Sequence, residues 1–150
     1  FGSARVEGGI NELYERTSVK IKILLCNCKG LCPSFQNADM DTLPFMVESE
    51  LDVQYTIVHP QLCGQGGNEV VMDIMRQSAA DPDTYIIGGA CAPEAQFKLF
   101  KKVMRNAGFD EKRFVPLDIR GTSNDGILLR LKEAVESILK PKEPAESAAA

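Results

Sequence analysis

Hydrophobic residues gather in four short runs along this chain, and segments of helical periodicity separate them. The runs are rich in β-branched and aliphatic side chains, which is typical of buried strands. They occupy residues 19–26, 53–59, 84–91 and 114–119. The segments between them place apolar side chains three or four positions apart, as amphipathic helices do. These helices are expected over residues 39–51, 68–79, 93–106 and 125–139. The alternation predicts a small α/β domain of Rossmann or flavodoxin-like type, with a mainly parallel four-stranded sheet and helices on both faces.

Single residues refine this pattern. Thr42 is the expected N-cap of the first helix, and Pro44 falls in its first turn, where proline is tolerated. Asn68 is expected to cap the second helix. Pro116 restricts the fourth strand to an edge or a bulge, because proline has no N–H to donate to a neighbour. The apolar side of the third helix is expected to hold Phe97, Phe100, Val103 and Met104.

Length and composition suit one domain. The chain has 150 residues and is 44% hydrophobic, which is enough to bury a single core. Residues 1–17 are expected to form an arm and residues 18–140 the folded domain. Residues 141–150 are rich in Pro, Glu, Ser and Ala without apolar periodicity, and they predict a disordered tail.

Charge and hydropathy exclude several classes of function. No apolar run approaches the roughly 18 residues of a membrane span. A net charge of −4 without a block of basic residues disfavours nucleic acid as a partner. The first residues lack the pattern of a secretory signal, so the expected location is the cytoplasm.

The five cysteines are the main candidates for chemistry. Cys26 and Cys28 lie at the end of the first strand, Cys32 in the loop after it, Cys63 after the second strand, and Cys91 at the end of the third. The carboxyl ends of parallel strands meet at one edge of the sheet, where ligands bind in such folds. In a reducing cytosol, thiols gathered there indicate a metal centre more than disulfides.

The type of metal follows from the donors. Thiols with a single histidine, His59, form a soft set that suits zinc or an iron–sulfur cluster. A structural zinc site commonly uses two short Cys-x₂₋₄-Cys knuckles, and only Cys28 and Cys32 have that spacing. The run C-N-C-K-G-L-C-P ends in Cys-Pro, as ferredoxin cluster runs do. His59 is expected to be a structural side chain.

Other features of this edge have two interpretations. Cys26 shares its strand face with Leu24 and fits the core as well as a ligand position. The segment C-G-Q-G-G-N after the second strand resembles an anion-binding loop, and its glycines can equally bring backbone amides to cluster sulfurs. Gly88 and Gly89 in the third strand allow a neighbour or a bound group to approach closely.

These residues resemble the N-terminal iron–sulfur domain of the flavin-containing subunit of heterodisulfide reductase and of its bacterial relatives, over about residues 20–123. In that family the first strand ends in Cys-x-Cys, matched by Cys26 and Cys28. The second leads to one cysteine and a Gly-containing loop, matched by Cys63. The third ends in Cys between small residues and then Pro, matched by Ala90-Cys91-Ala92-Pro93. The resemblance implies a 4Fe-4S cluster working beside a flavin that lies outside this domain.

The chain departs from that family at two positions. Where the family continues Ile-Arg-Glu-x-Cys, this chain has no cysteine in residues 119–123, and it has an additional one, Cys32. The fourth ligand is therefore either Cys26 or Cys32. No nucleotide-binding glycine fingerprint follows, so the flavin is expected on a partner chain. A more distant resemblance, to the delta subunit of methyl-viologen-reducing hydrogenases, implies a 2Fe-2S cluster.

The leading hypothesis is an electron-transfer subunit of a heterodisulfide-reductase-type complex, with Cys28, Cys63 and Cys91 as ligands. It would relay electrons between the redox centres of neighbouring subunits rather than act as an enzyme itself. One alternative is a thiol or persulfide carrier, in which Cys63 or Cys91 is activated by the helix that follows it. The other is a zinc-stapled interaction module.

Overall fold

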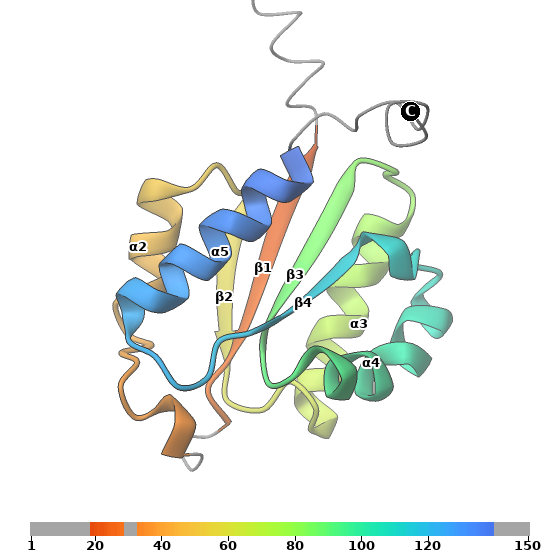
Figure 1. The fold of residues 1–150 in the computed structure, drawn as a ribbon. Coiled ribbons are helices and arrows are strands. Elements are labelled where there is room, and N and C mark those ends of the chain that lie inside the picture. Colours follow the sequence, from red (N-terminus) through yellow and green to blue (C-terminus); the bar gives the residue numbers. More distant parts are fainter. Residues whose placement is uncertain (1–18, 29–32, 140–150) are drawn as a thin grey trace, which may run out of the picture.

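The fold was obtained as a computed structural model, which describes residues 19–28 and 33–139. Four strands form one all-parallel sheet in the order β2-β1-β3-β4 (Figure 1). They are β1 (Lys20–Cys26), β2 (Tyr55–His59), β3 (Thr84–Ala90) and β4 (Phe114–Asp118). The expected arm, the expected tail and Cys32 lie outside the described residues.

Four helices cover the two faces of the sheet. They are α2 (Leu43–Glu50), α3 (Gln65–Ala79), α4 (Pro93–Ala107) and α5 (Asn124–Leu139), with 3-10 turns η2 (Pro33–Phe35) and η3 (Glu111–Arg113). Helices α3 and α4 pack on one face and α2 and α5 on the other (Figure 1). The predicted small α/β fold, with a parallel sheet and helices on both faces, is confirmed. None of the described helices is long and apolar enough to cross a bilayer.

The central strand β1 divides the core in two. Leu24 packs with the side chains of α3 and α4, whereas Ile23 and Leu25 pack with those of α2 and α5. All three are at most 1% exposed, which is why this strand has an almost continuous apolar sequence instead of an alternating one. Strand β4 lies at one edge of the sheet, so the prediction made from Pro116 is confirmed.

Helix α3 begins earlier than the sequence predicts, whereas α2 begins directly after Thr42, as predicted, but without the side-chain cap expected there. Helix α3 begins at Gln65 and not at Asn68, whose amide donates to the carbonyl of Gly64 inside the helix. Gly66 and Gly67 therefore belong to the first turn of the helix and not to a separate loop, and Gly64 is the N-cap. Thr42 does precede α2, but its hydroxyl donates to the carbonyl of Asp39 and caps no helical amide.

The apolar side of α4 also differs at one position. Phe100, Val103 and Met104 are buried as expected, but Phe97 is 40% exposed and its place in the core is taken by Gln96, which is fully buried. Phe97 instead lies against the edge of the Phe114 ring, with centroids 5.8 Å apart.

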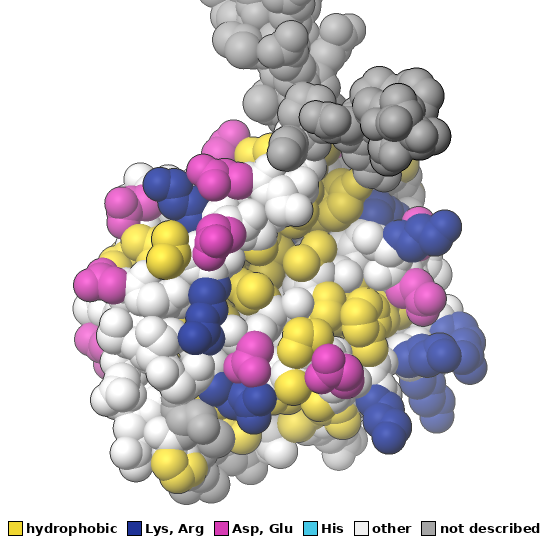
Figure 2. All heavy atoms as spheres, in the orientation of Figure 1, with side chains coloured by type: hydrophobic (Ala, Val, Ile, Leu, Met, Phe, Trp, Pro, Cys, Tyr) yellow, Lys and Arg dark blue, Asp and Glu magenta, His cyan; other side chains and the backbone are white. Residues whose placement is uncertain are grey.

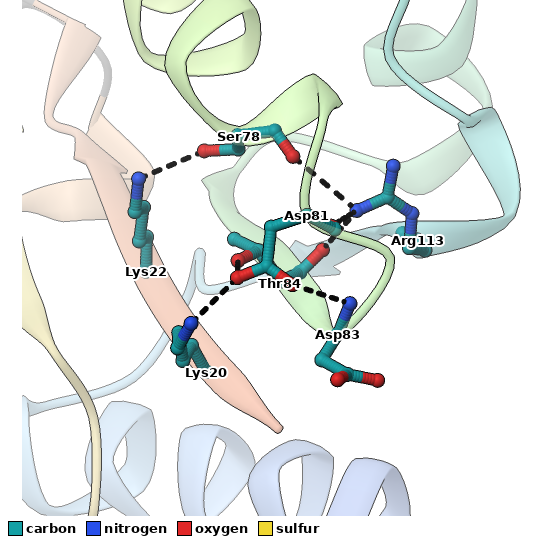
Figure 3. A network of polar contacts seen from close by, with 7 residues as sticks. All are labelled: Lys20, Lys22, Ser78, Asp81, Asp83, Thr84 and Arg113. Atoms are coloured by element: carbon teal, nitrogen blue, oxygen red, sulfur yellow. Dashed lines mark hydrogen bonds and ion pairs between the residues drawn. The ribbon is translucent and has the colours of Figure 1, made fainter. Parts of the chain in front are cut away.

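A polar network ties the amino end of β1 to the turn between α3 and β3 (Figure 3). Lys20 forms an ion pair of 2.7 Å with Asp81, which also accepts hydrogen bonds from the Thr84 hydroxyl and the Asp83 amide. Lys22, in the buried strand, donates to the Ser78 hydroxyl at 2.8 Å, and burial lowers its pKa. This end of the sheet is therefore held by polar contacts and contains no cysteine among the described residues.

Asp81 gives this network a predictable pH dependence. Hydrogen bonds, first of all from Lys20, lower the Asp81 pKa from 3.8 to about 2. Its contribution to stability is complete above the unfolded value of 3.8 and is lost as the pH falls through about 2. We expect Asp81→Asn to lower the free energy of unfolding at pH 7, and the deficit to shrink below pH 4, in urea titrations at several pH values. Asp83→Asn is the control, and an equal effect from it would contradict the assignment.

Candidate functional site

The four described cysteines lie where the topology predicts, at the carboxyl edge of the sheet. Cys26 is the last residue of β1, and Cys28 follows it after one residue. Cys63 lies in the turn between β2 and α3, and Cys91 directly follows β3. Because β1 and β3 are neighbours whose connections leave toward opposite faces, this edge is the topological switch point of the sheet.

These cysteines line a single small pocket. Its volume is about 50 Å³, and apolar side chains make up most of the remaining wall. The four thiols lie at graded depths: Cys26 is buried, Cys91 half-buried, and Cys28 and Cys63 exposed. The residues lining the pocket are Cys26, Cys28, Phe35, Leu62, Cys63, Ala90, Cys91, Gln96, Leu99 and Phe100. A wider hollow of about 630 Å³ along the exposed side of α3 has no cysteine in its lining.

Cys28 has an unusual backbone conformation. Its φ of 54° lies in the left-handed region, and it is the only non-glycine among the described residues with a positive φ. Such a conformation costs a side-chain-bearing residue about 1–3 kcal/mol and is found most often at functional sites. This conformation is a second reason, besides its place at the carboxyl edge, to count Cys28 among the candidate site residues.

Two helices begin beside the pocket. Helix α3 starts two residues after Cys63, and α4 starts two residues after Cys91. The first amides of a helix have no partner within it, and the helix dipole is positive at that end. Negative charge on either thiol, or on a group bound between them, is therefore stabilised by the backbone.

The electrostatics of Cys91 connect it with two other cysteines. Burial raises the pKa of Cys91, and the neighbouring Cys26 and Cys63 raise it further. The positive charge of Arg120 acts in the opposite direction and lowers it. Arg120 is held by two hydrogen bonds to the carboxylate of Asp118, of 3.0 and 2.9 Å. These bonds are also the main reason that the Asp118 pKa is lowered.

Gln96 is a site residue that the sequence did not indicate. Its amide nitrogen donates to the carbonyls of Cys91, at 2.8 Å, and of Leu117, at 3.1 Å. It therefore ties the loop that carries Cys91 to the end of β4. Gly88 makes room for it, because a Cβ there would lie 2.5 Å from the Gln96 amide oxygen. The close neighbour expected at this glycine is thus a side chain of the fold.

Among the described residues, three amide side chains have buried oxygens without a hydrogen-bond partner. They belong to Asn27, between two cysteines, to Asn68 in the first turns of α3, and to Gln96. Of the three, only Gln96 lines the pocket of the cysteines, and its nitrogen donates to two backbone carbonyls. Asn68 lines the hollow along α3 instead.

The donors of this pocket match an iron–sulfur cluster in chemical type, since thiolates and nearby N–H groups are what such clusters use. Among residues 19–28 and 33–139, no three Cys, His, Asp or Glu side chains are placed to hold one metal ion. His59 acts structurally: its Nδ1 accepts a 2.9 Å hydrogen bond from the Gln61 amide.

No family model matches this chain, and no curated protein matches it.

Proposed function

We propose that this chain is a cytoplasmic iron–sulfur electron carrier, in which one cluster is bound at the carboxyl edge of the sheet. The observation that carries the proposal is that four cysteines, located at or just after the ends of three different strands, line one pocket. Free cysteines that served only packing would be distributed over helix faces and strand interiors. When bound, the cluster would accept and release one electron at a time.

The ligands we propose are Cys28, Cys63 and Cys91, with either Cys26 or Cys32 as the fourth. Cys28 and Cys63 are exposed and the pocket itself has room for about one or two waters, so a cluster would lie at its mouth. Cys26 packs in the core, and its thiol lies 3.8 Å from the carbonyl of Pro60. The resemblance to the heterodisulfide reductase domain implies the 4Fe-4S type, and a set of four thiolates can equally hold a 2Fe-2S cluster.

The surroundings of the pocket suit the negative charge of a thiolate-ligated cluster. The first turns of α3 and α4 and the side chain of Arg120 each contribute positive potential on the side of Cys63 or Cys91. Positive potential and hydrogen bonds to sulfur both raise a cluster's reduction potential. The first turns of α3 and α4 and Arg120 would therefore raise the reduction potential of the cluster without being ligands.

The resemblance to the heterodisulfide reductase domain supports a place in a multi-subunit complex of that type, with the flavin on a partner chain. In that setting the chain would relay electrons between redox centres of neighbouring subunits. A thiol or persulfide carrier needs a lowered thiol pKa. Cys91 has a raised one, mainly through burial, which counts against that alternative at this residue.

Cysteine variants test the proposal. We expect the chain, reconstituted anaerobically with iron and sulfide, to bind both and to give a cluster EPR signal after reduction. Cys28→Ser, Cys63→Ser and Cys91→Ser should each lower iron and sulfide content to less than about a tenth of the wild-type value, because each removes a ligand. Far-UV circular dichroism would verify that each variant is folded.

The matched pair Cys26→Ser and Cys32→Ser identifies the fourth ligand, since one should lose the cluster and the other keep it. A wild-type chain that retains neither iron nor sulfide after reconstitution would refute the proposal. Binding of zinc alone would favour the interaction module, and activity lost with a single cysteine while metal content is unchanged would favour the thiol carrier.

A further inference from the structure

Helix α4 presents a basic face in an acidic protein. Lys98, Lys101, Lys102 and Arg105 are spaced i, i+3, i+4 and i+7, so they share one side of the helix, and all four are exposed. The whole chain has a net charge of −4, whereas α4 contains only one acidic residue, Glu94. Figure 2 shows Lys and Arg side chains gathered at the lower right, in the region of α4 in Figure 1.

None of the ion pairs in the described part of the chain involves this face. The two ion pairs among those residues join Lys20 to Asp81 and Arg120 to Asp118, and neither involves α4. Like charges four positions apart on a helix repel one another. A negatively charged partner bound to this face would offset the repulsion between the basic side chains and be attracted to them.

Two exposed apolar side chains flank the basic residues. Phe97 is 40% exposed and Leu99 45%, and Leu99 also lines the pocket of the cysteines. The N-terminal half of α4 is the half beside the pocket, because the helix begins directly after Cys91. A surface with a small number of apolar side chains among charged ones is typical of small, transient interfaces, in which electrostatic attraction sets the rate of association.

We propose that this α4 face, made of Phe97, Lys98, Leu99, Lys101, Lys102 and Arg105, is the docking surface for a small acidic electron-carrier protein. The carrier's carboxylates would surround its own redox centre, and docking would bring that centre to the cysteine pocket. With a cluster bound there, one electron would pass from the reduced carrier to it, so that the carrier would be oxidised and the cluster reduced without any change of bonds. This inference rests on the proposed function for its redox role.

The test uses a purified acidic 2Fe-2S ferredoxin as the probe and the full chain labelled with ¹⁵N. We expect the probe to shift amide resonances of α4 at low ionic strength, and high salt to weaken binding. Lys98→Glu combined with Lys102→Glu should raise Kd by about tenfold. Arg76→Glu combined with Lys132→Glu, on α3 and α5, makes the same change in net charge and should leave Kd nearly unchanged.

Equal weakening by the two double variants would overturn the inference, as would shifts on another face or binding that salt does not affect. Self-association of the chain through α4, measured by sedimentation, would also overturn it. The titration is repeated on the metal-free chain to separate the two proposals. If the chain binds the probe but never binds iron, the docking surface is supported and the proposed cluster is refuted. If the chain binds a cluster but not the probe, only the proposed docking surface is refuted.

Discussion

Replacing Arg113 with methionine is expected to destabilise the fold by about 3–4 kcal/mol, because its guanidinium satisfies several buried carbonyls that are expensive to leave unpaired. Arg113 is only 8% exposed. It donates to the carbonyls of Ser78, Asp81 and Thr84 (Figure 3) and to that of Ala79. These carbonyls lie at the end of α3 and in the turn into β3. Its guanidinium carbon also lies 4.6 Å from the centre of the Phe109 ring.

The measurement is the free energy of unfolding from urea titrations of the metal-free chain under reducing conditions. Arg113→Lys should recover little of the loss, because one ammonium group cannot reach carbonyls that a planar fork contacts from two nitrogens. The neighbour Lys112 is exposed, so Lys112→Met should change stability by less than about 0.5 kcal/mol. If Arg113→Met were as mild as Lys112→Met, the carbonyls would have to be satisfied by water instead.

The general fold could be predicted from the sequence because its signals are local and agree with one another. Each strand is a short apolar run, each helix has an apolar stripe, and the alternation leaves few topologies to consider. The beginning of α3 could not be predicted in this way. Gly66 and Gly67 indicate a loop by propensity, but both lie in the helix, where Gly67 packs against the backbone of the preceding turn.

The sequence predicts the cysteines of the candidate site, but it does not predict the side chain that holds the Cys91 loop in place. Strand ends can be recognised in a sequence, so the common edge of Cys28, Cys63 and Cys91 could be predicted. Gln96 could not, since a glutamine on an amphipathic helix is normally expected to be exposed. The role of Gln96 depends on a hydrogen bond to the carbonyl of Leu117, which is 21 residues away along the chain. The two residues are close only because β4 lies next to β3 in the sheet.

Two adjacent glycines in the first turn of α3 are expected to respond to alanine with opposite signs. A Cβ at Gly67 would lie 2.0 Å from the carbonyl oxygen of Gln61 and 2.5 Å from the Cα of Leu62. These are backbone atoms, so no side-chain rotation can relieve the overlap and the turn itself must move. We expect Gly67→Ala to cost more than about 3 kcal/mol, at or above the usual range for overpacking.

Gly66 is the matched control, because a Cβ there would meet nothing within 4 Å. Gly66→Ala should stabilise the chain by about 0.5–1 kcal/mol, since alanine loses less backbone entropy than glycine in a helix. Urea titrations of both variants measure this contrast, and equal effects would show that the helix does not pack on the Gln61–Leu62 turn. Because Cys63 directly follows that turn, Gly67→Ala should also lower the cluster content after reconstitution, whereas Gly66→Ala should leave it unchanged. The turn that precedes Cys63 can thus pack against α3 only because Gly67 has no side chain.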